Sequence, residues 1–462
     1  MKKEEQNVME KLISLCKQRG FIYQGSEIYG GLGGSWDYGP LGVALKNNVK
    51  TLWWKRFVTD REDMYGFDAA ILMNQNVWKA SGHVGGFSDP LVEDLATKKR
   101  YRADHLLEDN GIDTKGLKLE QMDALIKEKN LKSPEGNKLG EVRQFNMMFQ
   151  THVGAIQDDT SISYLRPETA QGMFVNFKNI IDSFHPKLPF GMGQIGKAFR
   201  NEISPRDFTF RTREFEQMEI EYFVKPEDWA ASFEEFRKEV WVYTQDIGLA
   251  QDKVHELEVA DGDRAHYSKR TIDFEFDYPF GKKELYGLAY RTDYDLGAHT
   301  KDSGAELSYF DEETKTRYIP HVIEPSFGVD RTVLAILTNA YTEDEMDGEV
   351  RTYLKLSPKV APVKVAVFPL LKNKVELTGK AKEVYVMLKK AFGAVMYDES
   401  GSVGKRYRRQ DEIGTPFCVT VDFDTLGEHP ELLNTVTIRD RDTGKQERIA
   451  IDQLITYVEG KM

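Results

Sequence analysis

The stretch that most constrains the fold is residues 191–223, GMGQIGKAFRNEISPRDFTFRTREFEQMEIEYF, in which the side chains alternate in character. Successive side chains of a strand point to opposite faces, so the early part, with Ile195 and Lys197 on one face, predicts a β-strand. Residues 203–211 predict a long turn, and residues 212–223 predict a return strand. We therefore expect a long antiparallel β-hairpin rich in arginine, glutamate and aromatic residues.

The return strand divides its side chains between two faces. One face carries Arg213, Phe215, Gln217 and Glu219, and the other carries Glu214, Glu216, Met218 and Ile220. At a rise of about 3.3 Å per residue, Phe215 and Glu219 stand roughly 13 Å apart in one cleft. An aromatic plate for a purine and a carboxylate for an amine fit those ends. A surface hairpin with many ion pairs is the competing explanation for these charges.

The order of these residues, FRNE followed by a further arginine and then REF, resembles motif 2 of the class II aminoacyl-tRNA synthetases, and its flanks resemble the glycyl branch. Residues 319–337, IPHVIEPSFGVDRTVLAIL, resemble motif 3, with Gly328 at a bend and Arg331 opening an apolar helix. Residues 26–58 and 165–177 are also similar to glycyl-tRNA synthetases. The matches run from about residue 20 to about residue 460 and have the expected order.

Other nucleotide-binding folds lack their motifs here. The glycines of residues 26–58 do not form G-x-G-x-x-G, and the chain has no G-K-S/T, which excludes the Rossmann and P-loop interpretations. Locally this stretch predicts a glycine-rich turn that leads into a helix. The apolar side of that helix consists of Val43, Leu45, Val49, Leu52 and Trp53.

Length and composition narrow the class of protein. A chain of 462 residues allows two or three domains. Its two cysteines, Cys16 and Cys418, are far apart, which favours a reducing compartment over a disulfide framework or a zinc site. No segment has the apolar length of a signal peptide core or of a membrane span of about 20 residues, so we expect a cytoplasmic protein without a membrane partner.

The net charge of −12 does not favour nucleic acid as a partner, but the local charge matters more than the total. Basic clusters occur at residues 98–102 and 405–409, each with a tyrosine inside. Either cluster alone is more often a solvated face than an RNA contact. The resemblance favours RNA for the second cluster, where it implies tRNA contacts by Arg406, Arg408 and Arg409.

The resemblance implies an α+β fold: a class II catalytic domain over residues 1–355, built on an antiparallel sheet, with insertions at about 85–160 and 225–280. Residues 356–462 then form an anticodon-binding domain with a mixed sheet. Alternating strands and helices after Arg351 agree with that second domain. Relatives often carry a CPxC-like metal knuckle in the first insertion, but this chain has SPEG at residues 133–136, so we expect no zinc.

The reaction that the resemblance implies is the formation of glycyl-adenylate from glycine and ATP, followed by transfer of the glycyl group to the 3′ end of tRNA(Gly). Because the glycine carboxylate is ionised at neutral pH, the first step needs no general base. Positioning and charge stabilisation then carry the catalysis. The implied cofactors are ATP and Mg²⁺.

For ATP, the resemblance assigns catalytic roles to Arg200 and Arg331. Arg200 would bridge the α-phosphate and the glycine carboxylate, and Arg211 and Arg331 would hold the β- and γ-phosphates. Phe215 would stack on adenine, with the Arg331 guanidinium on its other face. Glu202 would accept a hydrogen bond from the adenine amino group, and Glu284 would help to hold Mg²⁺. The full ATP set is Arg200, Asn201, Glu202, Phe210, Arg211, Thr212, Arg213, Glu214, Phe215, Glu284, Leu285, Gly328, Val329, Asp330 and Arg331.

Glycine offers an ammonium group and no side chain, so its site should be acidic and shallow. The positions that match the family are chiefly Glu168, Glu219, Glu324 and Ser326. No smaller amino acid competes, so an editing site is unnecessary. The full glycine set is Arg100, Glu168, Phe215, Glu216, Gln217, Met218, Glu219, Arg291, Glu324, Pro325, Ser326, Phe327 and Gly328.

The resemblance also implies a homodimer. The equivalent of motif 1 at residues 66–78 has Gln75 where relatives often have proline, which weakens the sequence evidence for dimerisation. Two alternatives stay open at this point. One is a synthetase-like accessory protein that binds nucleic acid without catalysis. The other is a ligase of the same class for serine, threonine or proline, which the three glutamates and the N-terminal stretch disfavour.

Overall fold

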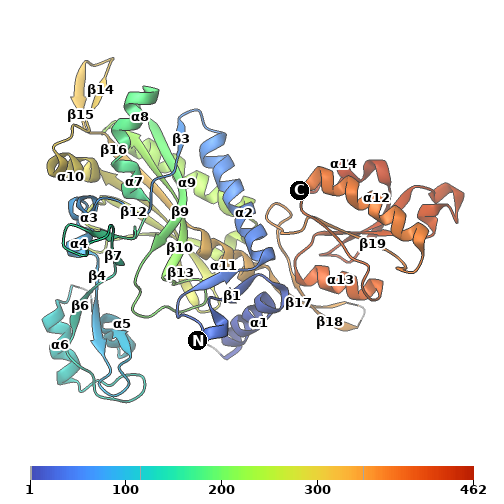
Figure 1. Ribbon diagram of the computed structural model, residues 1–462, viewed down its shortest axis with the longest axis horizontal. Helices are drawn as coiled ribbons and strands as arrows, with labels where there is room; N and C mark the ends of the chain where they lie inside the picture. The colour runs from blue at the N-terminus through green and yellow to red at the C-terminus, as the bar shows by residue number, and fades with distance from the viewer. Residues whose placement is uncertain (1–2, 115, 347) are drawn as a thin grey trace.

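The computed structural model describes residues 3–114, 116–346 and 348–462. A large N-terminal part holds a central sheet, and a smaller C-terminal part lies to one side of it (Figure 1). Helix α1 (Lys3–Arg19) begins the described chain and buries Leu12 and Cys16 against the large core. Among the described residues, no helix is long and apolar enough to span a membrane.

Seven strands in the order β11-β12-β13-β16-β10-β9-β3 form the central sheet. Neighbouring strands are antiparallel except for β3 and β9, which run parallel. Their bounds are β3 (Met64–Phe67), β9 (Phe190–Phe199), β10 (Glu214–Val224), β11 (Val254–Glu258), β12 (Arg270–Tyr278), β13 (Gly281–Thr292) and β16 (His321–Gly328). The predicted hairpin is confirmed as β9 and β10, which pair from Phe199↔Glu214 to Phe190↔Phe223.

The two faces of the sheet carry different cores. Helices α2 (Pro40–Trp54), α9 (Trp229–Asp246) and α11 (Val329–Ala340) contribute to one core together with Met218 and Ile220 of β10. Helices α7 (Ala170–Phe174), α8 (Phe177–Phe184) and α10 (Tyr294–Ser303) contribute to a second core that contains Phe223 of β10. Residues of β10 alternate between these faces, so Glu219 and Glu221 share the face of the second core.

Residues 88–146 form a subdomain with its own apolar cluster, which includes Val92, Leu107 and Met122. It contains the sheet β5-β4-β6 and two helices, and it extends away from the central sheet (Figure 1). The bounds are β4 (Ser88–Glu93), β5 (Arg100–Arg102), α5 (Ala103–Asp109), α6 (Leu119–Glu128) and β6 (Arg143–Asn146).

The second predicted insertion, at residues 225–280, is wrong. Helix α9 packs on β13 and β16, and strands β11 and β12 are part of the central sheet. The helix of this segment is α9, and on its outer side Arg237 and Arg270 pair with glutamates. The segment therefore completes the central sheet.

The C-terminal part has the mixed sheet that the sequence predicts, in the order β20-β19-β21-β22-β23. Strand β19 runs parallel to β20 and β21, whereas β21, β22 and β23 are antiparallel. The bounds are β19 (Val365–Pro369), α12 (Val375–Phe392), β20 (Val395–Tyr397), α13 (Val403–Glu412), β21 (Phe417–Val421), β22 (Thr435–Asp440), β23 (Gln446–Ala450) and α14 (Leu454–Glu459).

The boundary between the two parts lies later than the predicted residue 355. Leu356, Val360, Ala361 and Val363 pack in the large N-terminal core, whereas Val365 begins the C-terminal core. The hairpin of β17 (Tyr341–Met346) and β18 (Glu349–Leu354) follows α11 directly.

The remaining α-helices and β-strands are β1 (Ile22–Gln24), β2 (Trp36–Tyr38), α3 (Gln75–Ala80), α4 (His83–Gly86), β7 (Gln150–His152), β8 (Ile162–Tyr164), β14 (Tyr309–Asp311) and β15 (Thr316–Tyr318).

Buried ion pairs join this hairpin to the C-terminal part. The Arg351 side chain of β18 pairs with Asp344 of β17 at 2.6 Å and with Asp411 of α13 at 3.2 Å. Arg439 of β22 pairs with the same Asp411 carboxylate at 2.8 Å. Arg351 also donates to the Arg441 carbonyl oxygen at 2.7 Å. The hairpin is therefore bound to α13 and β22 through charged hydrogen bonds that are shielded from water.

Candidate active site

A polar pocket lies beside the ends of β9, β10 and β16, and it brings the distant Arg331 next to Arg200 and Arg211. Arg200 and Arg211 come from the loop between β9 and β10, whereas Arg331 lies in the first turn of α11. The pocket is lined by Arg200, Glu202, Thr209, Phe210, Arg211, Thr212, Phe215, Glu216, Gln217, Glu284, Leu285, Ser326, Gly328, Asp330 and Arg331. Most of the predicted ATP set therefore lines one pocket.

Aromatic rings and acceptors hold the arginines in place. The Arg200 guanidinium lies 5.3 Å from the Phe215 ring centroid, and its Nε donates to the Pro167 carbonyl oxygen at 3.1 Å. The Arg331 guanidinium lies 4.5 Å from the Phe210 ring centroid and 3.1 Å from a Glu284 carboxylate oxygen. Phe210 thus lies beside Arg331, and Arg200 approaches Phe215.

Arg331 also sets the charge of its neighbour. Its positive charge is the main cause that holds the pKa of Glu284 below the usual value, and its hydrogen bond acts in the same direction. On the adjacent strand β12, burial and the nearby Glu284 and Glu275 carboxylates together raise the pKa of Asp273 to about 7. Two carboxyl groups thus stand close to the arginines at this end of the sheet.

A buried group of charged residues, which we call the acidic cluster, adjoins the pocket. It consists of Glu168, Glu219, Glu221, Asp295 and Glu324 around the guanidinium of Arg291. Ser326 connects the two sites, because it lines the pocket and donates through Oγ to the Glu219 carboxylate at 3.0 Å. The predicted residues Glu168, Glu219, Arg291, Glu324 and Ser326 therefore lie together.

Most carboxylates of the cluster have donors. Arg291 donates twice to Asp295, from Nε and Nη2 at 2.8 Å each, and once more to Glu324. The second carboxylate oxygen of Glu219 accepts from the amide and the hydroxyl of Thr169, at 3.1 and 2.5 Å. Glu168 accepts from the Gln171 amide at 3.1 Å and lies 3.3 Å from His83 Nε2.

The cluster holds more acidic groups than cations. Burial raises the pKa of Glu324 to about 8, even though Arg291 acts to lower it. Burial and the charge of Glu168 raise the pKa of Glu219. Burial works against the ionised form of Glu168 as well, but His83 and Arg291 bring its pKa well below the usual range. A cation that enters this site would favour the ionised carboxylates.

Two family models and several known proteins match this chain. Residues 149–340 match the tRNA synthetase class II core domain (G, H, P, S and T), and residues 364–461 match the anticodon binding domain. The glycine–tRNA ligase of Clostridium tetani is 52% identical over 99% of this chain and 99% of the relative. The glycine–tRNA ligase of Deinococcus radiodurans is 48% identical over 98% of this chain and 99% of the relative. This chain belongs to the glycine–tRNA ligase family.

Membership of the glycine–tRNA ligase family decides between the alternatives left open by the sequence. A third relative, from Caldanaerobacter subterraneus, is also a glycine–tRNA ligase and is 52% identical over 98% of each chain. The three relatives named here are ligases for glycine, not for serine, threonine or proline, and not accessory proteins. The matched class II core contains both helices and strands, and the anticodon binding domain follows it in the chain.

Four predicted contact residues of this ligase are structural instead. Met218, Phe327 and Val329 are fully buried in the large core, and Pro325 is buried on the same side of β16 as Phe327. The reason is the strand period, since Pro325 and Phe327 alternate with Glu324 and Ser326. Residues next to a contact position in sequence thus face away from it.

Asp330 lines the pocket, but its carboxylate is occupied by the protein. It accepts hydrogen bonds from the Tyr38 hydroxyl at 2.5 Å, the Lys46 ammonium at 3.1 Å and the Glu216 amide at 2.7 Å. Glu216 in turn pairs with Lys46 at 3.1 Å. This network ties the start of α11 to α2 and β10, so Asp330 supports the pocket from behind.

Three other residues that were predicted to contact ATP lie outside the pocket lining. The Glu214 carboxylate pairs with Lys197 at 2.7 Å on the exposed side of the hairpin. Arg213 donates to the Glu202 carbonyl oxygen at 3.2 Å and to that of Gly33, outside the pocket lining. The Asn201 amide donates to the Met147 carbonyl oxygen at 2.7 Å, which fixes the loop backbone.

The structure does not bring Arg100 to the acidic cluster. Its side chain is 61% exposed on β5 of the inserted subdomain, where it lies 3.8 Å from Glu93 and lines a separate hollow. The residues of the absent metal knuckle lie in the same subdomain. Ser133 Oγ and the Asn137 amide donate to Asp94 at 2.6 and 3.0 Å. Within the described ranges, no group of three or more His, Cys, Asp or Glu side chains could hold a metal ion.

The three arginines that were predicted to contact tRNA differ in their placement, since one is buried and two line a groove. Arg406 is buried and donates to the carbonyl oxygens of Pro369, Glu399 and Gly401, so it stabilises the C-terminal part from within. Its prediction as a tRNA contact is wrong, because this side of α13 faces the protein. Arg408 and Arg409 instead line a groove between α13 and the β17–β18 hairpin.

Six residues in or beside the acidic cluster were not predicted from the sequence. They are His83, Thr169, Gln171, Tyr267, Asp295 and Glu221. Glu221 stands two positions after Glu219, so the strand period could have placed it on the same face. It is fully buried, and neither of its carboxylate oxygens has a hydrogen-bond partner among the described residues.

Proposed function

We propose that this family member activates glycine with ATP and then transfers the glycyl group to the 3′ end of tRNA(Gly). The observation that carries the proposal is the connection through Ser326 between the arginine-lined pocket and the acidic cluster. One site suits a chain of phosphates, and the other suits a small ammonium group. A zwitterion held between them would present its carboxylate to the nucleotide.

For ATP, the three arginines supply the positive charge. Arg200 stands beside Phe215, so a guanidinium that bridges the α-phosphate and the glycine carboxylate would lie next to the ring that stacks on adenine. Arg211 and Arg331 would hold the β- and γ-phosphates. The glycine carboxylate attacks the α-phosphorus, the bond to the bridging oxygen breaks, and pyrophosphate leaves with the electron pair. The arginines neutralise charge that moves toward the pyrophosphate.

For glycine, the carboxylates of Glu168, Glu219 and Glu324 would surround the ammonium group. Before glycine arrives, burial disfavours their full ionisation, and this raises the pKa of Glu219 and Glu324. The incoming ammonium group supplies the missing positive charge. Binding of glycine is then favoured by charge, and the absence of a side chain allows the close approach.

For Mg²⁺, the residues at this end of the sheet fit a site completed by the nucleotide. Glu284 and Asp273 offer oxygen ligands, and Mg²⁺ often uses one or two carboxylates together with substrate phosphates. The raised pKa of Asp273, about 7, reflects burial and crowding by Glu284 and Glu275, which a divalent cation would relieve. When bound, the ion would neutralise phosphate charge.

For tRNA(Gly), we assign Arg408 and Arg409 of α13 to contacts with the nucleic acid. Both line the groove beside the β17–β18 hairpin, together with Arg19 and Lys405. The Arg408 side chain is 45% exposed and pairs with the exposed Glu349. Local basic charge in this groove offsets the overall net charge of −12.

A homodimer and a cytoplasmic location complete the proposal. The segment equivalent to motif 1 forms the edge strand β3 of the central sheet and the start of α3, where Gln75 is the first helical residue. An edge strand has pairing groups on its outer side that a second copy can cover. Both cysteines are free thiols and are buried in different parts of the chain, which suits a reducing compartment.

The test is amino-acid-dependent exchange of labelled pyrophosphate into ATP. We expect exchange with glycine, and none above background with serine, threonine, proline or alanine. A complete absence of exchange with glycine would favour the accessory-protein alternative. Exchange that is as fast with a larger amino acid would contradict the assignment of the acidic cluster.

A further inference from the structure

A surface loop between β11 and β12 covers part of the acidic cluster. The loop spans residues 259–269 and is closed at its base, where the Val259 amide donates to Thr271 O at 2.9 Å and the Lys269 amide donates to Tyr290 O at 2.9 Å. Most of its residues are exposed, including Asp261 and Ala265. Tyr267 is only partly exposed, and its ring turns toward Arg291.

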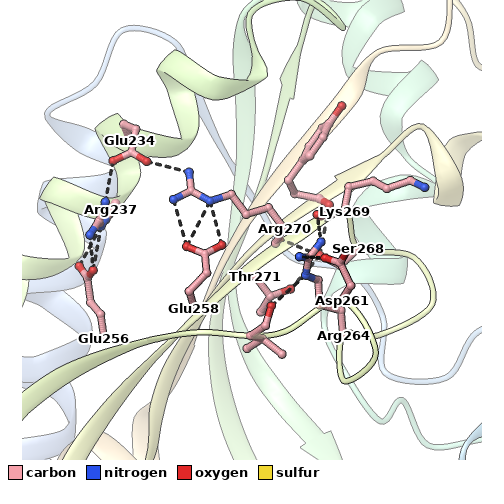
Figure 2. Close-up of polar contacts among 12 residues, drawn as sticks. Glu234, Arg237, Glu256, Glu258, Asp261, Arg264, Ser268, Lys269, Arg270 and Thr271 are labelled. Atoms are coloured by element: carbon pink, nitrogen blue, oxygen red, sulfur yellow. Dashed lines mark hydrogen bonds and ion pairs between the residues drawn. The ribbon is translucent and has the colours of Figure 1, made fainter.

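Arg264 fastens this loop from inside. Its Nε donates to the Val259 carbonyl oxygen at 2.9 Å, and its two terminal nitrogens reach the Lys269 carbonyl oxygen and the Asp261 carboxylate. Figure 2 shows Arg264 among Asp261, Ser268 and Lys269, apart from the row of ion pairs formed by Arg237 and Arg270. One side chain therefore holds the two ends of the loop together.

Residues on each side of Tyr267 are fixed as well. Ser268 Oγ donates to the Arg270 carbonyl oxygen and contacts Thr271 Oγ1, each at 2.8 Å. On the other side, His266 Nε2 lies 2.9 Å from the Tyr294 hydroxyl of α10. The backbone that carries Tyr267 is thus held between β12 and α10.

The Tyr267 ring lies against Arg291. The Arg291 guanidinium carbon is 3.8 Å from the Tyr267 ring centroid and 5.4 Å from that of Phe174. Arg291 is only 1% exposed, although the loop above it is on the surface. The electrostatic neighbours of the Tyr267 hydroxyl are Arg291, Glu324, Glu168 and Asp295, which are members of the acidic cluster. Tyr267 is therefore the side chain of this loop that separates the cluster from water.

We propose that Tyr267 is a positioning residue for amino-acid recognition, which covers Arg291 and holds its guanidinium against Glu324 and Asp295. This inference rests on the proposed function, in which Glu324 receives the glycine ammonium group. A cation against an aromatic face is attracted by the ring, and the attraction is stronger when water is excluded. The loop fastened by Arg264 keeps the ring in that place.

Loss of the Tyr267 ring should affect the glycine site and not the nucleotide pocket. If the ring is lost, water reaches Arg291, the charge pairing with Glu324 weakens, and Glu324 is no longer held in one orientation. The nucleotide pocket is built by other elements, namely the β9–β10 loop and α11. Removal of Tyr267 should therefore weaken glycine binding and leave ATP binding nearly unchanged.

The test uses the full-length protein and pyrophosphate exchange. For Tyr267→Ala we expect the KM for glycine to rise by about tenfold or more, which corresponds to roughly 1.4 kcal/mol, while the KM for ATP stays within about twofold of the unchanged protein. Tyr267→Phe keeps the ring and should retain nearly the original KM for glycine. Equal loss in both KM values, or a Tyr267→Ala variant with an unchanged KM for glycine, would overturn the inference.

A second pair of variants tests the loop itself. Arg264→Ala should raise the KM for glycine, because the loop no longer holds Tyr267 in place. Arg237→Ala removes an arginine of the neighbouring ion-pair row, which contacts Glu234 and Glu256 (Figure 2), and should leave the KM for glycine unchanged. An equal effect of the two variants would mean that general loss of charge, and not the loop, is responsible.

One further variant separates this inference from the proposed function. Glu324→Gln removes the carboxylate that we assign to the ammonium group and should raise the KM for glycine. If Glu324→Gln has no effect on that KM, the proposed glycine site is wrong. If Glu324→Gln weakens glycine binding but Tyr267→Ala does not, only the role of Tyr267 is wrong.

Discussion

At the scale of single residues, the molecule uses burial to set the charge of its carboxyl groups. The acidic cluster crowds five carboxyl groups around Arg291, and the hydrogen bonds are shared unequally among them. Glu219 has three donors, whereas Glu221, two residues later on the same strand, has none among the described residues. The same residue type thus has three hydrogen-bond donors or none among the described residues, depending on its position on β10.

Glu221 gives a prediction about stability and pH. Burial, reinforced by the charge of Glu324, raises the pKa of Glu221 well above the usual value. When the pKa of a carboxyl group is higher in the folded protein than in the unfolded chain, its contribution to stability is complete below the unfolded pKa of about 4.3. As the pH rises above that value, this contribution falls by about 1.4 kcal/mol per pH unit for as long as the group stays protonated in the folded protein. Glu221→Gln should therefore melt at a higher temperature than the unchanged protein at pH 7.

The pH dependence of that difference is the decisive measurement. Calorimetric melting at pH 5 and pH 7 should show a difference that grows with pH. Glu312→Gln removes a carboxylate whose side chain is 74% exposed, and it should show little difference at either pH. A difference for Glu221→Gln that is constant with pH would mean that the group is ionised in the folded protein.

Arg200 gives a prediction about catalysis. Its loss should lower glycine-dependent pyrophosphate exchange by about a hundredfold or more, as removal of one charge-stabilising donor does in other active sites. Arg206→Ala is the matched control, because Arg206 lies in the same loop but is half-exposed and pairs with Asp207. Similar loss in both variants would contradict the special role of Arg200. Circular dichroism should show that both variants fold.

At the scale of elements, the sequence predicted what local periodicity controls. The β9–β10 hairpin was predicted from alternation, and the C-terminal sheet from the alternating strands and helices after Arg351. The pocket arginines were found because motifs place them at element ends. The second insertion was predicted wrongly, because the packing of α9 on the sheet and the pairing of β11 and β12 within it depend on contacts that no local pattern shows.

Site residues that depend on distant contacts were harder to predict. Asp295 and Tyr267 belong to the cluster only because α10 and a surface loop meet Arg291, and no local pattern indicates this. Phe327 and Met218 were predicted as contacts, although the alternation of their own strands points them into the core. Family motifs identify a stretch, and the strand period then decides which of its residues face the site.

The start of α11 gives a prediction at this scale. Asp330 pairs with Lys46, and both side chains are only 8% exposed. Asp330→Ala leaves a buried ammonium group with one partner fewer and should cost about 3 kcal/mol of stability. Lys11→Ala breaks an exposed pair with Glu343 and should cost far less. Melting temperatures will compare them, and equal decreases would contradict the structural role of Asp330.

At the scale of the whole molecule, the two parts divide the proposed reaction between them. Arg408→Ala combined with Arg409→Ala should raise the KM for tRNA in aminoacylation by about tenfold, a loss of roughly 1.4 kcal/mol, because basic charge that faces phosphates is lost. Glycine-dependent pyrophosphate exchange should stay unchanged, since neither side chain lines the nucleotide pocket. If exchange also fell, the two parts would not act separately.

A matched variant makes this measurement specific. Arg317→Ala removes an exposed arginine of β15 that contacts Glu306, on the other side of the central sheet from the C-terminal part (Figure 1). Its KM for tRNA should not change. A similar increase for Arg317→Ala would show that overall charge, and not the groove beside α13, attracts the tRNA.

The ion pairs of Arg351 connect these two parts mechanically. Helix α11 carries Arg331 in its first turn and runs into β17 without an intervening loop, and β18 returns to Asp411 in the C-terminal part. A twelve-residue helix is about 18 Å long and stiff. Arg331 thus lies near one end of α11, and the β17–β18 hairpin at its other end is paired with Asp411, so we expect a tilt of the C-terminal part to displace the end of α11 that lines the pocket.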